Sequence, residues 1–419
     1  MSAVVPAVEV PEVAPRKQGG NALRWLLWFA IGFVALALLR VSTGANDINS
    51  TGALRAALVA SIPIALAGLG GLWSERAGVV NIGLEGMMIV GTLGAGYMGY
   101  QHGVIAGVLG ALVFGAIGGV LHAVATVIFG VDHIVSGVAI NIMAVGIAGF
   151  LAEQFFADLP GGGPTQSPPL PHAWSLNIGP LDDLCREMAG KGIFLVSDAF
   201  SLLGVLVGGF NALTMLALLL AVATWWILWH TAFGLRIRSV GESPSAAESL
   251  GVNVYFYKFV AVTVSGALAG LGGAYLAMVS FSGYQNGQTG GLGYIGLAAL
   301  IFGNWRPGGL MIGAGIFGYT QAIQLRGGTE SLHALLLGIA VALVCVAVWQ
   351  ARRRLWSKVI GAGLGALVFF VWFFATDEVP RHFTGMAPYV TTLLVLALFA
   401  QQLRMPAADG QTYRKGSAG

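Results

Sequence analysis

The side chains best placed to do chemistry interrupt an apolar stretch at residues 70–86, which reads GGLWSERAGVVNIGLEG. Glu75, Arg76, Asn81 and Glu85 break a run that would otherwise continue through a bilayer. Ionisable groups at membrane depth are costly and usually pair with one another or face a cavity. The glycines would let the backbone leave helical geometry, which is tolerated only where it lines protein or water. Two readings stay open: a broken helix beside a polar passage, or a short cytoplasmic turn at the Ser-Glu-Arg triplet.

A second interrupted stretch lies at residues 290–309, which read GGLGYIGLAALIFGNWRPGG. Its apolar run is too short to cross a bilayer straight, since a crossing needs about 20 residues. Asn304 and Trp305 break the run. Short, glycine-broken segments in two halves of a chain point to a transport site. Gln321 and Gln324 follow on a predicted helix and could either line a path or hydrogen-bond between helices.

Other chemistries find little support in the residue types present. The two cysteines, Cys185 and Cys345, cannot form a disulfide framework or a thiolate metal site. The histidines at 102, 122 and 133 lack metal-ligand spacing and are interpreted as loop or packed residues. No phosphate-binding loop occurs, because Gly190-Lys191 lacks the earlier glycine and the Ser or Thr that the motif requires. We therefore expect no catalytic residues, no metal site and no cofactor bound by this chain.

The composition indicates which kind of element must position these groups. Only 9% of the 419 residues are charged and 56% are hydrophobic, whereas a soluble protein carries roughly 25% charged residues. The net charge of +3 leaves no electrostatic footprint for nucleic acid. We therefore predict an all-α polytopic membrane protein of about 10–12 crossings, with broken or re-entrant segments. The predicted spans lie near 25–39, 54–73, 84–100, 103–129, 134–152, 208–230, 258–280, 291–304, 308–325, 331–350, 359–375 and 388–403.

Basic residues in short loops predict the orientation of these spans. Arg and Lys cluster before residue 25, after 230, after 350 and after 403, so both termini are expected on the cytoplasmic side. The predicted organisation is a disordered tail at 1–23, a core transmembrane domain at 24–350, an extra helix pair at 351–403 and a cytoplasmic tail at 404–419. Residues 153–200 are expected to form a large external loop.

The internal loop at 231–257 predicts a short helix. Ser243 suits an N-cap, Pro244 suits the first helical position, and Gly251 suits the residue past the end. A helix of about two turns is marginal alone in water. It therefore packs on its own membrane domain or on a partner, or it is an ordinary capped surface helix.

Three segments resemble one permease subunit of bacterial nucleoside ABC importers, a family related to branched-chain amino acid and ribose permeases. The stretch from Ser74 to Met88, SERAGVVNIGLEGMM, is similar to the first signature of that subunit. The stretch from Gly293 to Trp305, GYIGLAALIFGNW, resembles its second signature, and Gly241-Glu-Ser-Pro244 its cytoplasmic coupling segment. The resemblance covers roughly residues 50–350. The N-terminal tail, the long external loop and the final helix pair depart from the family core.

The resemblance implies a transport subunit that is not an enzyme, in the inner membrane of a bacterium. Its implied partners are a homologous second permease, an ABC ATPase that uses ATP, and a substrate-binding lipoprotein or periplasmic binding protein. A nucleoside suits aromatic stacking and amide or carboxylate hydrogen bonds. The candidate path residues are Asn81, Glu85, Asn304, Trp305, Gln321 and Gln324. The coupling segment, 234–255, would contact the ATPase through Glu242, Ser243, Pro244, Ser245, Ala246, Ala247 and Glu248.

Three alternatives remain at this stage. A simple sugar or a branched-chain amino acid is the alternative cargo within the same class of importer. An ion- or proton-coupled secondary transporter would need a relay of intramembrane carboxylates, and Glu85 has no convincing second member. A membrane-embedded enzyme would need paired carboxylates or a nucleophile motif, which the sequence does not offer.

Overall fold

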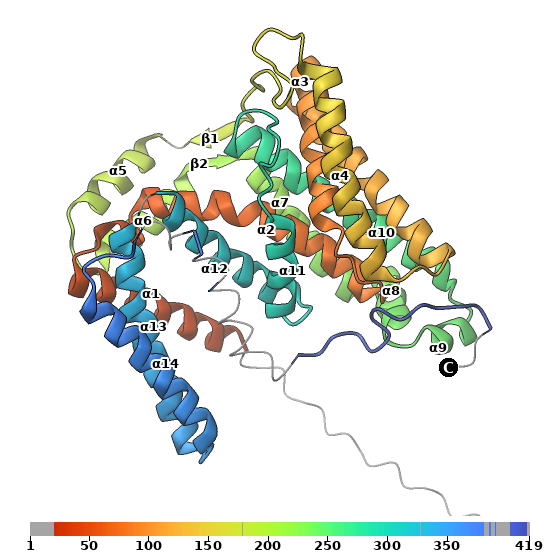
Figure 1. Cartoon of the computed structure of the whole chain (residues 1–419). Coiled ribbons are helices and arrows are strands. Elements are labelled where there is room, and N and C mark those ends of the chain that lie inside the picture. Colours follow the sequence, from red (N-terminus) through yellow and green to blue (C-terminus); the bar gives the residue numbers. More distant parts are fainter. Residues whose placement is uncertain are drawn as a thin grey trace, which may run out of the picture.

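The computed structural model describes residues 21–177, 179–326, 328–380, 385–386, 390 and 403–416. This part of the chain is helical apart from two short strands, which confirms the predicted all-α class (Figure 1). The elements are α1 (Asn21–Thr43), η1 (Asn46–Asn49), α2 (Thr51–Arg76), α3 (Leu84–Ala123), η2 (Val124–Ile128), α4 (His133–Phe156), β1 (Ser175–Asn177), α5 (Gly179–Gly190), α6 (Val196–Val207), β2 (Gly208–Asn211), α7 (Ala212–His230), α8 (Ala232–Glu242), α9 (Pro244–Ser249), α10 (Val254–Tyr275), η3 (Leu276–Ser280), α11 (Leu292–Phe302), α12 (Pro307–Leu325), α13 (Thr329–Arg352) and α14 (Trp356–Ala375).

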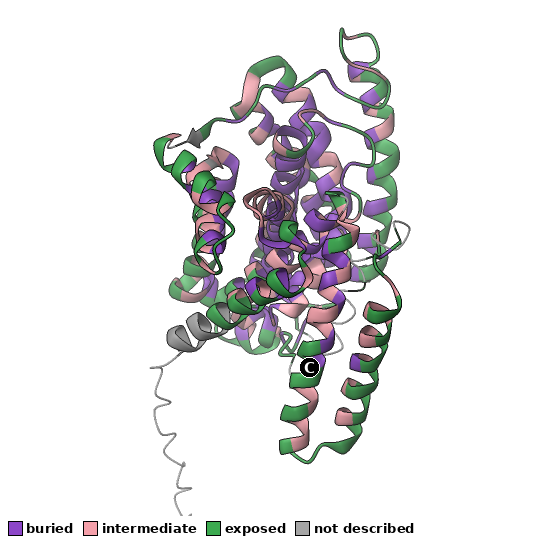
Figure 2. Ribbon diagram, turned by 90° about the vertical axis from the view of Figure 1, so that its left-hand side faces the viewer, coloured by how far each residue is buried: buried purple, intermediate pink, exposed green. Residues whose placement is uncertain are grey.

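Two helices form the centre of the bundle. Among the apolar segments long enough to span a membrane, α2 is 78% buried and the α10 segment is 72% buried. The α14 segment is 6% buried, and its apolar side chains face outward. Figure 2 shows the same gradient, with buried residues gathered in the middle of the bundle and exposed residues on the outer helices. An apolar surface of this kind suits contact with lipid.

Glycines allow α3 and α10 to pack with their backbones in contact. A Cβ atom added at Gly91 would lie 2.4 Å from Gly270, and one added at Gly115 would lie 2.4 Å from the carbonyl oxygen of Gly266. Membrane helices gain van der Waals contact and weak hydrogen bonds from this close approach. Gly266 and Gly270, four residues apart on α10, therefore serve helix packing.

The α3 segment is a hairpin of two antiparallel helices. The chain reverses at Gly103, whose torsions of φ 85° and ψ −175° lie outside the helical region. After the reversal, Gly110 returns to pack against Gly94, where an added Cβ would lie 2.7 Å from the Gly110 carbonyl oxygen. The two predicted spans near 84–100 and 103–129 correspond to the two arms.

A second hairpin is formed by α11 and α12. With 11 residues, α11 is about 16 Å long and cannot cross a bilayer. The chain turns at residues 303–306, and Gly303 lies against Gly309 and Leu310, where an added Cβ would lie 2.2 Å from the Leu310 nitrogen. The segment is therefore re-entrant, as its short apolar run predicts.

Residues 153–211 contain more structure than the external loop that the sequence predicts. Helices α5 and α6 follow one another, and β1 pairs with β2 in antiparallel fashion. Buried acids tie this region to the bundle: Asp198 pairs with Arg40 at 3.2 Å and Asp182 with Arg55 at 2.6 Å. The predicted span near 208–230 begins later, at Ala212, because residues 208–211 pair as a strand.

Seven helices in the described ranges are long and apolar enough to cross a membrane, which supports a multi-pass membrane protein. One of these seven is the α3 hairpin with its η2 extension, so it supplies two crossings. The predicted N-terminal tail lies mostly outside the described residues. The predicted last span near 388–403 lies almost entirely outside them.

Candidate functional site

The first interrupted stretch forms a break between α2 and α3. Helix α2 ends at Arg76, Gly78 takes a left-handed φ of 78°, and α3 begins at Leu84. The Ser-Glu-Arg triplet therefore forms the last helical turn of α2. The non-helical break follows it. Ser74 and Glu75 are buried, so this triplet is not a solvated loop. We call residues 77–83 the first re-entrant turn.

Side chains from three helices satisfy the backbone of the first re-entrant turn. A backbone polar group in the apolar part of a membrane protein must find an internal partner. The contacts are His122 Nε2 with Val80 O at 3.0 Å, Lys258 Nζ to Gly78 O at 3.4 Å, Asn141 Nδ2 to Ile82 O at 3.0 Å, and Val80 N to His133 Nδ1 at 3.4 Å. Sequence reasoning missed Asn141 and Lys258 in this role. Their only signal was that each is an isolated polar residue at or near the start of a predicted apolar span.

Asn81 is completely buried in the first re-entrant turn. Its Nδ2 donates to Ser265 Oγ on α10 at 2.8 Å, and also lies 3.4 Å from Met87 Sδ. Its Oδ1 is buried and accepts no hydrogen bond from the described residues. Asn81 therefore joins two helices and carries one unused acceptor.

Glu85 caps the second interrupted stretch. Its carboxylate accepts hydrogen bonds from Thr289 Oγ1 at 2.6 Å, Gly291 N at 2.9 Å and Gly293 N at 2.7 Å. These donors lie at the N-terminus of α11, where the helix dipole also favours a negative charge. Gly293 has to be glycine, because an added Cβ would lie 2.6 Å from the backbone of Glu85. The two signature segments thus meet at this carboxylate.

The same two segments meet again beyond the end of α2. Trp305 Nε1 donates to the Glu75 carboxylate, and Arg76 Nε donates to Trp305 O at 3.0 Å. Asn304 and Trp305 have positive φ angles of 54° and 53°, which are uncommon for residues other than glycine. Asn304 turns its Oδ1 towards the C-terminal segment, where it accepts from Arg404 N at 2.6 Å. We call residues 303–306 the second re-entrant turn.

The structure divides the six candidate path residues into two groups. Asn81, Glu85, Asn304 and Trp305 lie in or beside the two re-entrant turns. Gln321 and Gln324 lie near the far end of α12, about 21 Å along the helix from Pro307 to Gln321. Gln321 Oε1 is buried and has no hydrogen-bond partner among the described residues. The six residues therefore lie at several levels along the bundle.

The predicted coupling segment contains two helices where the sequence predicts one. Helix α9 has Pro244 at its first turn, and Gly251 after its end has a φ of 80°, as predicted. Ser243 occupies the predicted N-cap position, although its side chain makes no capping hydrogen bond. Helix α8 precedes α9 and was missed, because its apolar face is short and alternates with Arg236 and Arg238.

Close packing fixes α8 against the first re-entrant turn. A Cβ added at Gly241 would lie 2.2 Å from the carbonyl oxygen of Arg76. Trp229, which precedes α8, lies between two guanidinium groups, with Arg76 and Arg238 at 5.2 and 5.5 Å from its ring. Helix α8 therefore packs directly on the end of α2.

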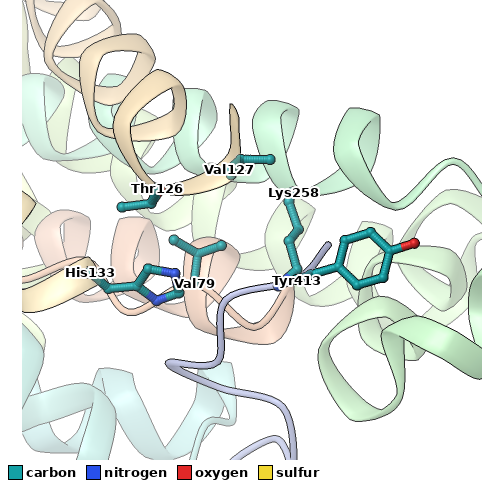
Figure 3. Close-up of a pocket in the computed structure, with 6 residues that line it drawn as sticks. All are labelled: Val79, Thr126, Val127, His133, Lys258 and Tyr413. Carbon is teal, nitrogen blue, oxygen red and sulfur yellow. The ribbon is translucent and has the colours of Figure 1, made fainter. Parts of the chain in front are cut away.

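A pocket lies beside the first re-entrant turn (Figure 3). It leaves no room for even a water molecule, so it is far smaller than the roughly 300–1,000 Å³ of a typical ligand site. Its lining residues are Val79, Thr126, Val127, His133, Lys258 and Tyr413. Tyr413 belongs to the C-terminal segment, so a tail residue closes a gap in the membrane domain.

Comparison with known proteins places these features in context. The profile of the family described as branched-chain amino acid transport system / permease component matches residues 53–347. The nucleoside ABC transporter permease protein NupC of Lactococcus lactis is 34% identical over 366 residues, covering 85% of this chain and 95% of the relative. The guanosine ABC transporter permease protein NupQ of Bacillus subtilis is 33% identical, covering 86% and 96%.

More distantly, the guanosine ABC transporter permease protein NupP of Bacillus subtilis is 24% identical over 358 residues, covering 80% of this chain and 95% of the relative. No solved structure matches this chain.

Proposed function

The chain belongs to the branched-chain amino acid transport system / permease component family, and from this premise we propose that it carries nucleosides as a membrane subunit of an ABC importer. Membership of the family and the curated relatives make it a multi-pass permease subunit. The cargo, the path, the partners and the orientation are the parts that we propose.

The observation that supports a nucleoside cargo is the extent of the match to NupC and NupQ. Each similarity runs over about 370 residues and covers at least 95% of the relative. The matched length includes both re-entrant turns and the coupling segment. A neutral nucleoside also needs hydrogen-bonding groups rather than a fixed charge, which agrees with the buried amides of Asn81 and Gln321.

We propose that the path runs between the first re-entrant turn and the α11–α12 hairpin. Asn81 and Gln321 each hold a buried amide oxygen that accepts no hydrogen bond from the described residues. An unsatisfied acceptor costs free energy in an apolar environment, and a solute that donates to it would recover that cost. Glu85 holds the two interrupted segments together at the start of α11 and Trp305 does so beyond its end, so separation of these contacts would open the path. Asn304 and Gln324 lie at the two ends of the same route.

The partners follow from the class of transporter. A binding protein would deliver the nucleoside to the outer face, and an ATPase would dock on the cytoplasmic face and hydrolyse ATP. A second, homologous permease would complete the pathway. That Bacillus subtilis has both NupQ and NupP supports this pairing, since each is named as a guanosine ABC transporter permease.

We propose that the end of the bundle carrying α8 and α9 faces the cytoplasm of a bacterium. Arg236, Arg238 and Lys258 lie at this end, and cytoplasmic loops of membrane proteins are enriched in basic residues. The ATPase would contact α9 and the end of α8, through residues 242–248. The close contact of Gly241 with Arg76 would pass its movement to the path.

Uptake by the complete transporter tests the cargo. We expect labelled guanosine and other nucleosides to enter a strain that lacks its own nucleoside carriers only when this chain and its partners are expressed. Unlabelled ribose, glucose and leucine should not compete. Competition by a sugar or by leucine, without competition by nucleosides, would assign the cargo to the alternative class. Uptake that persists after ATP depletion would favour a secondary transporter.

The path is tested by removing the unused acceptors. Asn81→Ala and Gln321→Ala should each lower nucleoside uptake at least fivefold at equal amounts of protein in the membrane. Gln350→Ala is the matched control. Gln350 on α13 also has a buried Oε1 with no hydrogen-bond partner among the described residues, but it lies outside both interrupted segments. Equal losses in all three variants would argue against the proposed route.

A further inference from the structure

The C-terminal segment, residues 403–416, lies against the end of the bundle that carries α8 and α9 (Figure 1). The sequence predicts only a cytoplasmic tail there. Instead, Pro406, Ala408 and Asp409 are buried. A segment without helix or strand that buries three residues must form specific contacts, because ordering its backbone costs about 1–2 kcal/mol per residue.

One set of contacts joins the segment to the coupling helices. Ala408 N donates to Gly241 O at 2.9 Å, and Ala407 N donates to the Glu242 carboxylate at 3.3 Å. Tyr413 interacts through its hydroxyl with Glu248 on α9. The end of α8 and α9 itself are therefore both held by the segment.

A second set joins the segment to both re-entrant turns. Arg404 N donates to Asn304 Oδ1 at 2.6 Å, in the second turn. A Cβ added at Gly78 would lie 3.1 Å from Ala408 O, so the segment packs closely on the first turn. The Asp409 side chain enters the membrane domain next to the Glu75 carboxyl, within electrostatic reach of Arg76 and Lys258.

A third set joins the segment to α10. Lys415 N donates to the Tyr255 hydroxyl at 3.3 Å, and the rings of Tyr255 and Tyr413 lie 5.4 Å apart. Together the contacts reach every element that would carry force from a cytoplasmic partner to the path. They are spread along the segment, from Arg404 to Lys415.

The segment does not cover the outward face of α9. Ser245, Ala246, Ser249 and Leu250 are exposed, and Leu250 is 85% exposed. A flap that blocked docking would lie over these residues. The segment instead contacts Gly241 and Glu242 at the end of α8, and it leaves the exposed residues of α9 free for docking.

We propose that residues 403–416 are a brace, which makes the coupling helices and the two re-entrant turns move as one body. The proposal rests on the proposed function only in that the partner docking on α9 is an ATPase. Without the brace, the ATPase would still bind and hydrolyse ATP, but its movement would be transmitted through α8 alone.

Truncation and point substitution test the brace in the complete transporter reconstituted in proteoliposomes. Deletion of residues 403–419, and separately Ala408→Pro and Tyr413→Ala, should lower the cargo moved per ATP hydrolysed at least fivefold. Co-purification of the ATPase should be unchanged. Ala408→Pro removes the donor to Gly241 O while altering a single residue, which covers the case in which the truncated chain fails to fold. Thr412→Ala, at an exposed position of the same segment, is the control and should match the wild type.

A covalent lock separates a brace from a flap. In a Cys345→Ser background, Lys415→Cys with Tyr255→Cys, which lie in contact but outside the proposed docking residues, would be joined by a short bifunctional thiol reagent; Cys185 is buried and can stay. A brace predicts that the locked transporter keeps at least half of its coupled activity. Loss of activity on locking, or increased transport on truncation, would overturn the proposal and indicate autoinhibition. Unchanged coupling after truncation would also overturn it.

In this design, the proposed nucleoside cargo and the proposed brace can be refuted independently of each other. ATP hydrolysis stimulated by the binding protein is measured alongside transport. If the wild-type complex moves sugar rather than nucleoside, the nucleoside assignment fails while the effect of truncation on coupling is still measured.

Discussion

Glu85 shows that a carboxylate inside a membrane protein can either contact a solute or stabilise the end of a helix. Its position in an apolar stretch predicts either contact with a solute or a hydrogen bond at a helix end. The structure places three donors on its carboxylate, from Thr289, Gly291 and Gly293. A charge that is surrounded by donors at a helix N-terminus is stabilised without a cavity. Its assignment to the path stays a prediction, and its role as a cap is what the geometry supports.

Glu85→Ala separates these roles. The change leaves three buried donors without an acceptor, at about 1–3 kcal/mol each. We expect a lower melting temperature of the purified protein in detergent and less protein in the membrane. Glu153→Ala, an exposed glutamate on α4, is the control and should leave the melting temperature unchanged. A normal melting temperature combined with lost transport would place Glu85 in contact with the solute instead.

Asp409 gives the docked C-terminal segment a dependence on pH. Burial raises the pKa of its carboxyl from 3.8 to about 7. A group whose pKa is raised on docking favours the docked state while it is protonated, so docking weakens as pH rises from about 4 to 7 and then levels off. The charged groups that face it are Glu75, Arg76 and Lys258.

Spin labels at Thr412→Cys and Ser249→Cys, in a Cys345→Ser background, would follow this docking. The short-distance population should be larger at pH 5.5 than at pH 8. Asp409→Asn removes the titrating group and should flatten the profile. A profile of the same shape in the Asn variant would show that another group is responsible.

Among helices and turns, the sequence predicted best the elements whose first and last residues are determined by neighbouring residues in the chain. Pro244 and Gly251 bound α9 because one restricts φ at a helix start and the other tolerates a left-handed φ after its end. The interruption near Asn304 was equally visible, since the apolar run before it is short. The break at 77–83 was visible too, as glycines and polar residues in an apolar stretch.

The remaining elements depend on contacts that are distant in sequence. Helices α5 and α6 are held by Arg40 and Arg55, more than 120 residues away, and their acids looked like ordinary loop charges. Asn141 and Ser265 are single polar residues in apolar spans, and nothing local tells which backbone they serve. The C-terminal segment has no periodic pattern at all, so its docking site could not be inferred.

Helix α9 is the element whose removal tests coupling most directly. Replacing Pro244–Ser249 with a flexible Gly-Ser stretch should leave the protein inserted in the membrane but lower uptake at least tenfold, while ATP hydrolysis continues. The physical reason is that a flexible stretch cannot push on α8. Replacing residues 411–412, which are exposed in the C-terminal segment, with Gly-Ser provides a control of similar chemistry. Full transport by the α9 variant would make this helix an ordinary surface element.

For the molecule as a whole, burial decreases from α2 and α10 outwards to α14. Buried polar contacts also join these central elements, as between Asn81 and Ser265 and between Glu85 and Thr289. This arrangement suits a protein whose outside faces lipid and whose inside must change shape. It also separates two ends, one carrying the α5–α6 region and the other carrying α9.

Labelling of single cysteines tests the orientation of these two ends. In the Cys345→Ser background, a cysteine at Trp174, which is 72% exposed, should react with a membrane-impermeant maleimide in intact spheroplasts. A cysteine at Ser249 should react only after the membrane is permeabilised. The reverse pattern would place α9 outside and exclude the proposed docking of an ATPase there.

The left-handed pair Asn304–Trp305 has a further consequence. Each residue in this conformation costs roughly 1–2 kcal/mol relative to a right-handed one, and the hydrogen bonds to Glu75, Arg76 and Arg404 hold it in place. If those bonds part, the two residues can return to right-handed torsions and release that energy. A glycine at either position would remove this torsional cost, but it would also remove the side-chain hydrogen bond to Glu75 or to Arg404.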